Sequence, residues 1–208
     1  MQIILAKTAG FCFGVDRAVE MVAESVRSGN KTATLGPIIH NRHVVEKFQK
    51  LGVREIAAPE EAEPDETVII RAHGVPKQVQ KRLSDCGVPA LDATCPFVKK
   101  IHTIVKNETE KGRRIIIFGS PAHPEVEAIA SFCDSPVIVQ SPEELENWLA
   151  EDPSRREMPL SMVSQTTSAQ KMWESCVRIA KKECTNCEIF DTICRATEMR
   201  QEEAAILS

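Results

Sequence analysis

The chain has 208 residues, 42% of them hydrophobic and 27% charged, which is ordinary for a globular protein that can bury a substantial core. A formal net charge of −4 excludes nucleic-acid binding as the main role, because no excess of cations is available to neutralise phosphates. The opening residues, MQIILAKTAG, hold only a short apolar run, and no run approaches the length of a membrane span, so we expect a cytoplasmic protein. In that reducing compartment the eight cysteines indicate metal ligands, reactive thiols or small buried residues.

Strands and helices alternate along the first half of the chain. We expect strands at residues 2–6, 31–35, 67–71 and 88–92, and helices at residues 15–27, 43–51, 77–83 and 97–111. The first of these helices, for example, has its apolar residues at 15, 18, 19, 22 and 26, which is one helical face. Residues 60–65 form an acidic connector between the second helix and the next strand.

The second half of the chain continues the same alternation. We expect strands at residues 113–118, 136–140, 159–164 and 188–191, and helices at residues 126–132, 142–150, 168–183 and 195–207. Ser141 and Pro142 are a cap and a first helical residue. The alternation predicts an α/β fold with parallel sheets, in which ligands bind at the loops that follow the strands.

Three cysteines share one local setting, because Cys12, Cys95 and Cys194 each follow a predicted strand and precede a predicted helix. Helix starts favour negative charge, and the thiolate is the form of cysteine that binds metals. Three thiolates on one iron–sulfur cluster would leave one iron without a protein ligand, as a Lewis-acid or substrate-binding cluster requires. The alternative is that these are three unrelated buried cysteines.

Three histidines also lie on loops between a strand and a helix, namely His40, His73 and His123. Imidazoles grouped beside helix starts would make a phosphate or diphosphate site. The alternative is that each is an isolated surface or packing residue, which is the role we give to His43 and His102 inside helices.

A carboxyl and two hydroxyls stand near these loops. Glu125 comes two residues after His123 and is a candidate general acid, although a first-turn glutamate is also favoured by the helix dipole alone. Thr166 and Thr167 follow a strand, and on the residues alone we expect them to cap the next helix rather than to bind substrate.

The remaining cysteines give weaker signals. Cys184 and Cys187 form a C-x-x-C pair at the end of a helix, but no second such pair accompanies them to make a zinc ribbon. Cys86, Cys133 and Cys176 are expected to be packing residues.

Taken together and in order, several segments resemble the 4-hydroxy-3-methylbut-2-enyl diphosphate reductases, the LytB-type iron–sulfur family that completes the methylerythritol phosphate route to isoprenoids. The segments extend over nearly the whole chain: AGFCFGVDRAV (9–19), GPIIHN (36–41), RAHGV (71–75), DATCP (92–96), HPEVEA (123–128), SQTT (164–167) and DTICRATEMRQ (191–201). As a set they are highly specific, whereas none would be so alone.

The resemblance implies a role for each candidate residue. A [4Fe–4S] cluster would be held by Cys12, Cys95 and Cys194, and the substrate diphosphate would contact His40, His73 and His123. Thr166 would contact the substrate, an allylic diphosphate, and Glu125 would donate the proton. The substrate hydroxyl would bind the open iron and leave as water, with electrons from a ferredoxin or a flavodoxin, and isopentenyl and dimethylallyl diphosphate would be the products.

The resemblance also implies a cloverleaf of three α/β lobes around the iron–sulfur site. We expect an N-terminal strand and Cys12 loop at 1–13, lobes at 14–96 and 97–193, and the start of a third lobe at 194–208. Similar proteins continue beyond this point with a Ser-x-Asn pair and a further serine that bind the diphosphate. We therefore expect a shortened third lobe and a 208-residue chain with little or no activity by itself. Ala128 also departs from the family, which has glycine there.

Two rival interpretations remain. The chain could be a non-catalytic module, either an electron carrier or a zinc-binding protein that uses Cys184, Cys187 and Cys194. It could also be a relative of the reductase that binds a diphosphate without turning it over. Single cysteine-to-serine changes separate the first rival from the reductase, which needs Cys12 and Cys95 but neither cysteine of the C-x-x-C pair.

Overall fold

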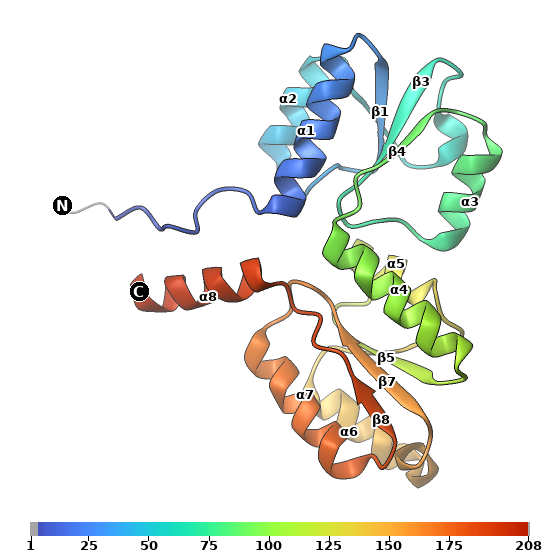
Figure 1. Cartoon of the computed structure of the whole chain (residues 1–208), viewed down its shortest axis with the longest axis vertical. Coiled ribbons are helices and arrows are strands. Elements are labelled where there is room, and N and C mark those ends of the chain that lie inside the picture. Colours follow the sequence, from blue (N-terminus) through green and yellow to red (C-terminus); the bar gives the residue numbers. More distant parts are fainter. Residues whose placement is uncertain (1–3, 208) are drawn as a thin grey trace. The chain divides into compact units, whose positions relative to one another are not determined.

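The computed structural model describes residues 4–207, and the chain divides into two compact units (Figure 1). The first unit is Phe11–Lys100, and the second unit comprises Met1–Gly10 and Ile101–Ser208. Each unit is built on a four-stranded parallel sheet, which confirms the predicted α/β fold class. Among the described helices, none is both long enough and apolar enough to cross a bilayer.

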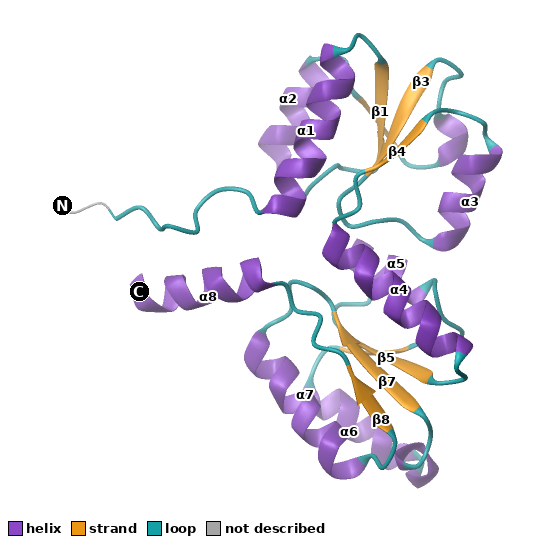
Figure 2. Ribbon diagram, in the orientation of Figure 1, coloured by secondary structure: helices purple, strands orange, loops and turns teal. Residues whose placement is uncertain are grey.

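The first unit has the strand order β2-β1-β3-β4, with all neighbours parallel. Its strands are β1 (Lys31–Leu35), β2 (Arg54–Ile56), β3 (Glu66–Ile70) and β4 (Ala90–Asp92), and its helices are α1 (Phe13–Arg27), α2 (Arg42–Lys50) and α3 (Lys77–Asp85), with a 3-10 turn at Pro59–Glu61. Figure 2 shows α1 and α2 on one side of this sheet and α3 on the other. Successive residues of β3 divide accordingly, because Ile69 packs with α1 and α2 whereas Val68 and Ile70 pack with α3.

The second unit repeats this topology with the order β6-β5-β7-β8, again all parallel. Its strands are β5 (Arg114–Phe118), β6 (Val137–Val139), β7 (Leu160–Ser164) and β8 (Cys187–Ile189). Its helices are α4 (Pro96–Glu110), α5 (Pro124–Ala130), α6 (Pro142–Glu151), α7 (Gln170–Glu183) and α8 (Arg195–Leu207), with a 3-10 turn at Pro153–Arg156. The residues of α4 from Ile101 on belong to this unit. Ile116 packs with α6 and α7, and the next residue, Ile117, packs with α4 and α5. Both faces of the sheet are therefore buried, as is usual for parallel strands.

The N-terminal segment of the second unit is held by α8. The carboxylate of Glu203 accepts hydrogen bonds from the N–H groups of Lys7 and Thr8 at 2.6 and 2.7 Å and from the Thr8 hydroxyl at 2.5 Å. Arg200 donates to the carbonyl oxygens of Thr8 at 3.2 Å and Gly10 at 2.6 Å. Two segments almost 200 residues apart in the sequence are thus joined by charged side chains.

Most predicted helices and strands are confirmed to within two residues at their ends. Ser141 caps α6 as predicted, because its hydroxyl accepts from the N–H of Glu144 at 3.2 Å. The strand expected at 2–6 is wrong for residues 4–6, which have no regular structure, and residues 2 and 3 lie outside the described residues. Strand β2 is not predicted by the sequence, because it has three residues and two of them, Arg54 and Glu55, are exposed.

Replacing Leu83 by Ala should lower the free energy of unfolding by about 2–5 kcal/mol, because a buried leucine leaves a cavity. Leu83 is 2% exposed and packs between α3 and the sheet of the first unit. Leu51, which is 55% exposed in the same unit, is the matched control, and Leu51→Ala should change this free energy by less than about 0.5 kcal/mol. Urea unfolding followed by circular dichroism measures both variants, and equal losses would contradict this assignment of the core.

Candidate functional site

The strand order places the loops after two central strands of each sheet at a topological switch point. In the first unit these loops follow β1 and β3 and carry His40 and His73. In the second unit they follow β5 and β7 and carry His123, Glu125 and Thr166. Ligands of open α/β sheets bind at such points, just beyond the carboxyl ends of the strands.

In the first unit, Cys12 and Cys95 are brought together at the starts of two helices. Cys12 is the N-cap residue of α1, and its side chain makes no capping hydrogen bond. Cys95 directly precedes Pro96, the first residue of α4. A Cβ atom added to Gly14 would lie 2.5 Å from the Cys95 sulfur, so the absence of a side chain at Gly14 makes room for this thiol. The first turn of α1 therefore carries one candidate ligand and cradles the other.

The loop that carries Cys95 is fixed from two directions. Arg17 of α1 donates to the carbonyl oxygens of Asp92 and Thr94 at 3.1 and 3.2 Å. The carboxylate of Asp92 accepts from the N–H of Thr94 at 2.9 Å and forms an ion pair with Lys99 at 2.6 Å. Asp92 is thereby held ionised, because its hydrogen bonds and ion pair lower its pKa against the opposing effect of burial.

The donor chemistry of this place fits an iron–sulfur group. The Thr94 hydroxyl is buried beside Cys95 in the sequence and finds no hydrogen-bond partner among the described residues. A buried hydroxyl of this kind is suited to donate a hydrogen bond to a thiolate or sulfide sulfur, and such bonds tune the properties of iron–sulfur groups.

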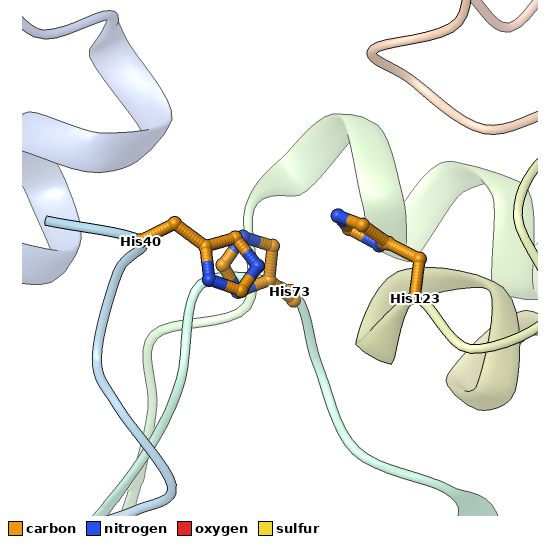
Figure 3. A group of neighbouring side chains, drawn as sticks. All are labelled: His40, His73 and His123. Atoms are coloured by element: carbon orange, nitrogen blue, oxygen red, sulfur yellow. The ribbon is translucent and has the colours of Figure 1, made fainter.

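The two histidines of the first unit lie side by side (Figure 3). The ring centroids of His40 and His73 are 4.2 Å apart with planes inclined at 38°. His40 is exposed and His73 is half-buried, so that both rings can be reached by a ligand from solvent. Paired imidazoles of this kind can donate hydrogen bonds to an anion.

In the second unit, Glu125 is buried at the start of α5 and is 2% exposed. One carboxyl oxygen accepts from the N–H of Thr166 at 2.6 Å, and the other is 2.7 Å from the Thr166 hydroxyl. Burial raises the pKa of Glu125 above its usual range, although the Thr166 hydrogen bonds act in the opposite direction. A carboxyl that keeps its proton to higher pH is the form needed for a general acid.

His123 is fixed in one orientation by the helix it precedes. As the N-cap of α5, its Nδ1 accepts from the N–H of Glu125 at 3.1 Å. A neutral ring that accepts at Nδ1 carries its proton at Nε2, which is then a hydrogen-bond donor. Ala128, where the resembling family has glycine, is completely buried in the same helix, so the methyl group is accommodated by packing.

Cys194 is positioned by the loop that carries Thr166. Its N–H donates to the carbonyl oxygen of Thr166 at 2.9 Å, and it directly precedes α8. Its own carbonyl oxygen accepts from Thr197 at 2.8 Å and from Glu198 at 3.2 Å, which closes the first turn of that helix. Within this unit, Thr166 thus hydrogen-bonds both to a candidate ligand, Cys194, and to a candidate acid, Glu125. The expectation that Thr166 caps α7 is wrong, because that helix begins at Gln170 with Ala169 as its N-cap.

The other cysteines do not resemble a metal site. Cys184 and Cys187 are half-buried against the core of the second unit, and burial raises the pKa of both thiols, that of Cys187 to about 12. Cys176 is completely buried and Cys133 half-buried, as expected, whereas Cys86 is exposed, so its assignment as a packing residue is wrong.

Several residues that shape the site have no signature in periodicity or spacing. Gly14, Arg17 and Thr94 act through contacts between segments far apart in the sequence, and Thr192 does so in the second unit. Each lies inside one of the segments that resemble the family. That resemblance indicates that these segments belong to the site, but it does not predict which contacts these residues make.

Comparisons with known proteins agree with the geometry. The chain matches the family described as "LytB protein" over residues 3–208. It is 42% identical to the 4-hydroxy-3-methylbut-2-enyl diphosphate reductase of Caldanaerobacter subterraneus subsp. tengcongensis and 39% identical to that of Clostridioides difficile, with all of this chain aligned to 72% and 74% of those proteins.

Two solved structures are also similar. One is an (E)-4-hydroxy-3-methyl-but-2-enyl diphosphate reductase, described as the terminal enzyme of the non-mevalonate pathway, with a TM-score of 0.81, 36% identity, and coverage of 99% of this chain and 72% of that one. The other is the corresponding reductase of Plasmodium falciparum, with a TM-score of 0.83, 28% identity, and coverage of 93% and 61%. The chain therefore belongs to the LytB protein family.

Proposed function

We propose that this protein reduces 4-hydroxy-3-methylbut-2-enyl diphosphate to isopentenyl and dimethylallyl diphosphate by removal of its hydroxyl group as water. The reductases of the same name to which the chain is similar support this assignment. The observation that carries it is the buried Glu125, whose pKa is raised by burial and whose carboxyl is held by Thr166, next to the loop of Cys194. A protonated carboxyl beside a candidate metal ligand suits a reaction that must protonate a leaving hydroxyl.

A [4Fe–4S] cluster is the cofactor of this proposal, held by Cys12, Cys95 and Cys194. When bound, it would supply electrons one at a time and an iron able to act as a Lewis acid. The close approach of the Cys95 thiol to Gly14, in the same helical turn as Cys12, and the buried hydroxyl of Thr94 support this assignment in the first unit.

The substrate diphosphate is bound, in this proposal, by His40, His73 and His123. The adjacent rings of His40 and His73 offer two donors from the first unit. The Nε2 proton of His123 offers a third donor from the second unit, because its Nδ1 is already occupied by the N–H of Glu125.

Glu125 donates the proton, and Thr166 contacts the substrate while holding Glu125 in place. The Thr166 hydroxyl can donate to the ionised carboxyl or accept from the protonated one, so the pair keeps its hydrogen bond before and after proton transfer. The 2.6 Å bond from the Thr166 N–H fixes the other carboxyl oxygen, so the acid does not rotate away.

The electron donor of the proposal is a ferredoxin or a flavodoxin, and the compartment is the cytoplasm, where thiol ligands stay reduced. Three exposed phenylalanines lie within two residues of Cys12 or Cys95 in the sequence, namely Phe11, Phe13 and Phe97. Exposed aromatic side chains beside redox ligands suit transient docking of a small electron carrier.

We also propose the lobe boundaries given above, with an N-terminal segment and Cys12 loop at 1–13 that would pair with the third lobe, lobes at 14–96 and 97–193, and the start of the third lobe at 194–208. The bonds from Lys7 and Thr8 to Glu203, and from Arg200 to Gly10, support the association of these two end segments.

The proposed activity is tested by anaerobic reconstitution with iron and sulfide, followed by addition of 4-hydroxy-3-methylbut-2-enyl diphosphate and a reduced viologen. We expect the substrate to perturb the spectrum of the cluster and isopentenyl and dimethylallyl diphosphate to form at a low rate, in keeping with the little activity expected above for the 208-residue chain by itself. A spectral change without product would favour a relative that binds the diphosphate without turnover. The absence of both a spectral change and product would contradict the proposal.

Iron content should depend on only three of the eight cysteines. Cys12→Ser, Cys95→Ser and Cys194→Ser should each reduce bound iron from about four atoms per chain to about one or fewer, because the cluster has no other thiolate to replace the missing ligand. Cys184→Ser and Cys187→Ser are the matched controls and should retain the iron. Iron and sulfide are counted after anaerobic desalting. Retention of iron by Cys12→Ser and Cys95→Ser, with loss in Cys184→Ser and Cys187→Ser, would favour the zinc or electron-carrier alternative, which shares Cys194 with the proposal.

Glu125→Gln should reduce product formation at least about 100-fold, because the amide cannot supply the proton. The substrate-induced spectral change should remain. Glu127→Gln is the matched control, since Glu127 is an exposed glutamate of the same first helical turn and should be replaceable with little effect. Equal activity of the Glu125 and Glu127 variants would contradict the assignment.

The difference in stability between Glu125→Gln and the unmodified chain should also depend on pH in a defined direction. Because the pKa of Glu125 is raised in the folded chain, its protonated carboxyl stabilises the fold at low pH, and this contribution is lost as pH rises through the folded pKa. Glu125→Gln should therefore gain stability relative to the unmodified chain as pH rises through that range. Urea unfolding at several pH values measures this, and a constant difference would contradict the raised pKa.

A further inference from the structure

The segment that leads to Cys194 runs beside the end of β7. Two backbone bonds join them, from Phe190 N–H to the Met162 carbonyl oxygen and from Cys194 N–H to the Thr166 carbonyl oxygen, both at 2.9 Å. Midway between these bonds, the side-chain hydroxyl of Thr192, instead of a backbone group of the segment, bonds to the backbone of β7. It accepts from the N–H of Ser164 at 2.7 Å and donates to the carbonyl oxygen of the same residue at 2.7 Å.

We propose that Thr192 is a positioning residue that holds Cys194 in fixed register with Thr166. Through Thr166, which bonds both Cys194 and Glu125, the same clamp would fix the distance between a cluster ligand and the catalytic acid. The roles of Cys194 and Glu125 in this inference rest on the proposed function, whereas the clamp itself is a statement about the chain alone.

The physical argument concerns the two backbone groups of Ser164. Ser164 is completely buried and Thr192 is 9% exposed, so water does not replace their partners freely. A hydroxyl can accept one hydrogen bond and donate another at once, which an apolar side chain of the same shape cannot do. The loss of this hydroxyl would leave both a buried N–H and a buried carbonyl oxygen unpaired, and the segment would be expected to move to recover them.

Threonine is better suited than serine to this position. Two heavy atoms on Cβ restrict the side-chain rotamer, so the threonine hydroxyl is already directed before its bonds form. Serine would retain both bonds with more freedom. Thr192→Ser therefore preserves the clamp chemically, whereas Thr192→Val preserves the shape and removes the clamp.

A matched control is available in the first unit. Thr32 is 2% exposed, and its hydroxyl bonds to the Ser25 hydroxyl at 2.8 Å and to the Asn30 carbonyl oxygen at 3.1 Å. Thr32→Val removes a similarly buried, doubly bonded hydroxyl at a position without contact to any candidate ligand. A general cost of losing a buried hydroxyl would appear in both valine variants.

Two measurements on the full chain test the inference. The first is amide hydrogen exchange, resolved to single residues by NMR, in the chain without iron. In Thr192→Val the Cys194 amide should exchange at least about tenfold faster, while Thr192→Ser and Thr32→Val stay within about twofold of the unmodified chain. The second is the rate of iron loss to a chelator after reconstitution, which should rise about 10-fold or more in Thr192→Val alone.

Equal exchange of the Cys194 amide in Thr192→Val and in the unmodified chain would overturn the inference, as would equal acceleration of iron loss in Thr32→Val. If Thr192→Val does not fold, amide exchange in the unmodified chain still tests the inference. Its Ser164 amide should exchange as slowly as that of Gln165, which bonds the Phe118 carbonyl oxygen at 2.8 Å, and rapid exchange would overturn the clamp. Failure of the proposed function is separate, because Cys12→Ser and Cys95→Ser would then retain their iron whatever the exchange shows.

Discussion

Parallel strand pairing is the constraint on which the rest of the structure depends. In each unit the two central strands, β1 with β3 and β5 with β7, pair in parallel over five residues, so their following loops emerge at the same edge of the sheet. After each central strand the chain continues to the outer strand beside it, β2 beside β1 and β4 beside β3 in the first unit and β6 beside β5 and β8 beside β7 in the second. Among the described residues, no crossover therefore runs over the loops between the two central strands. His40 and His73 in one unit, and Glu125 and Thr166 in the other, owe their proximity to this pairing.

The same repeated topology explains where Cys95 and Cys194 lie. The last strand of each sheet, β4 or β8, is short and is followed within a few residues by a cysteine at the start of a helix. Each such loop is tied by polar side chains rather than by continued strand pairing, through Arg17 and Asp92 for Cys95 and through Thr192 for Cys194. Polar ties of this kind fix the backbone of each cysteine at the start of a helix.

Much of this arrangement is predictable from the sequence, and the exceptions have physical reasons. Long apolar periodicities and Ser141 give the helices and central strands, but β2 has only three residues and two exposed charged side chains. The role of Thr166 is misjudged from its neighbours because its partner, Glu125, is 41 residues away. Cys86 is expected to be buried because cysteines usually are, yet it ends α3 in solvent. Contacts made by tertiary folding have no local pattern from which to infer them.

The central proposal is that three cysteine thiolates hold one four-iron cluster and leave one iron without a thiolate ligand. Mössbauer spectroscopy of the chain reconstituted with ⁵⁷Fe tests this most directly, because it resolves iron sites by their ligands. We predict one iron site of four that differs from the others and changes when the diphosphate substrate is added. Four irons with equivalent thiolate ligands, or a spectrum that the substrate leaves unchanged, would contradict the account.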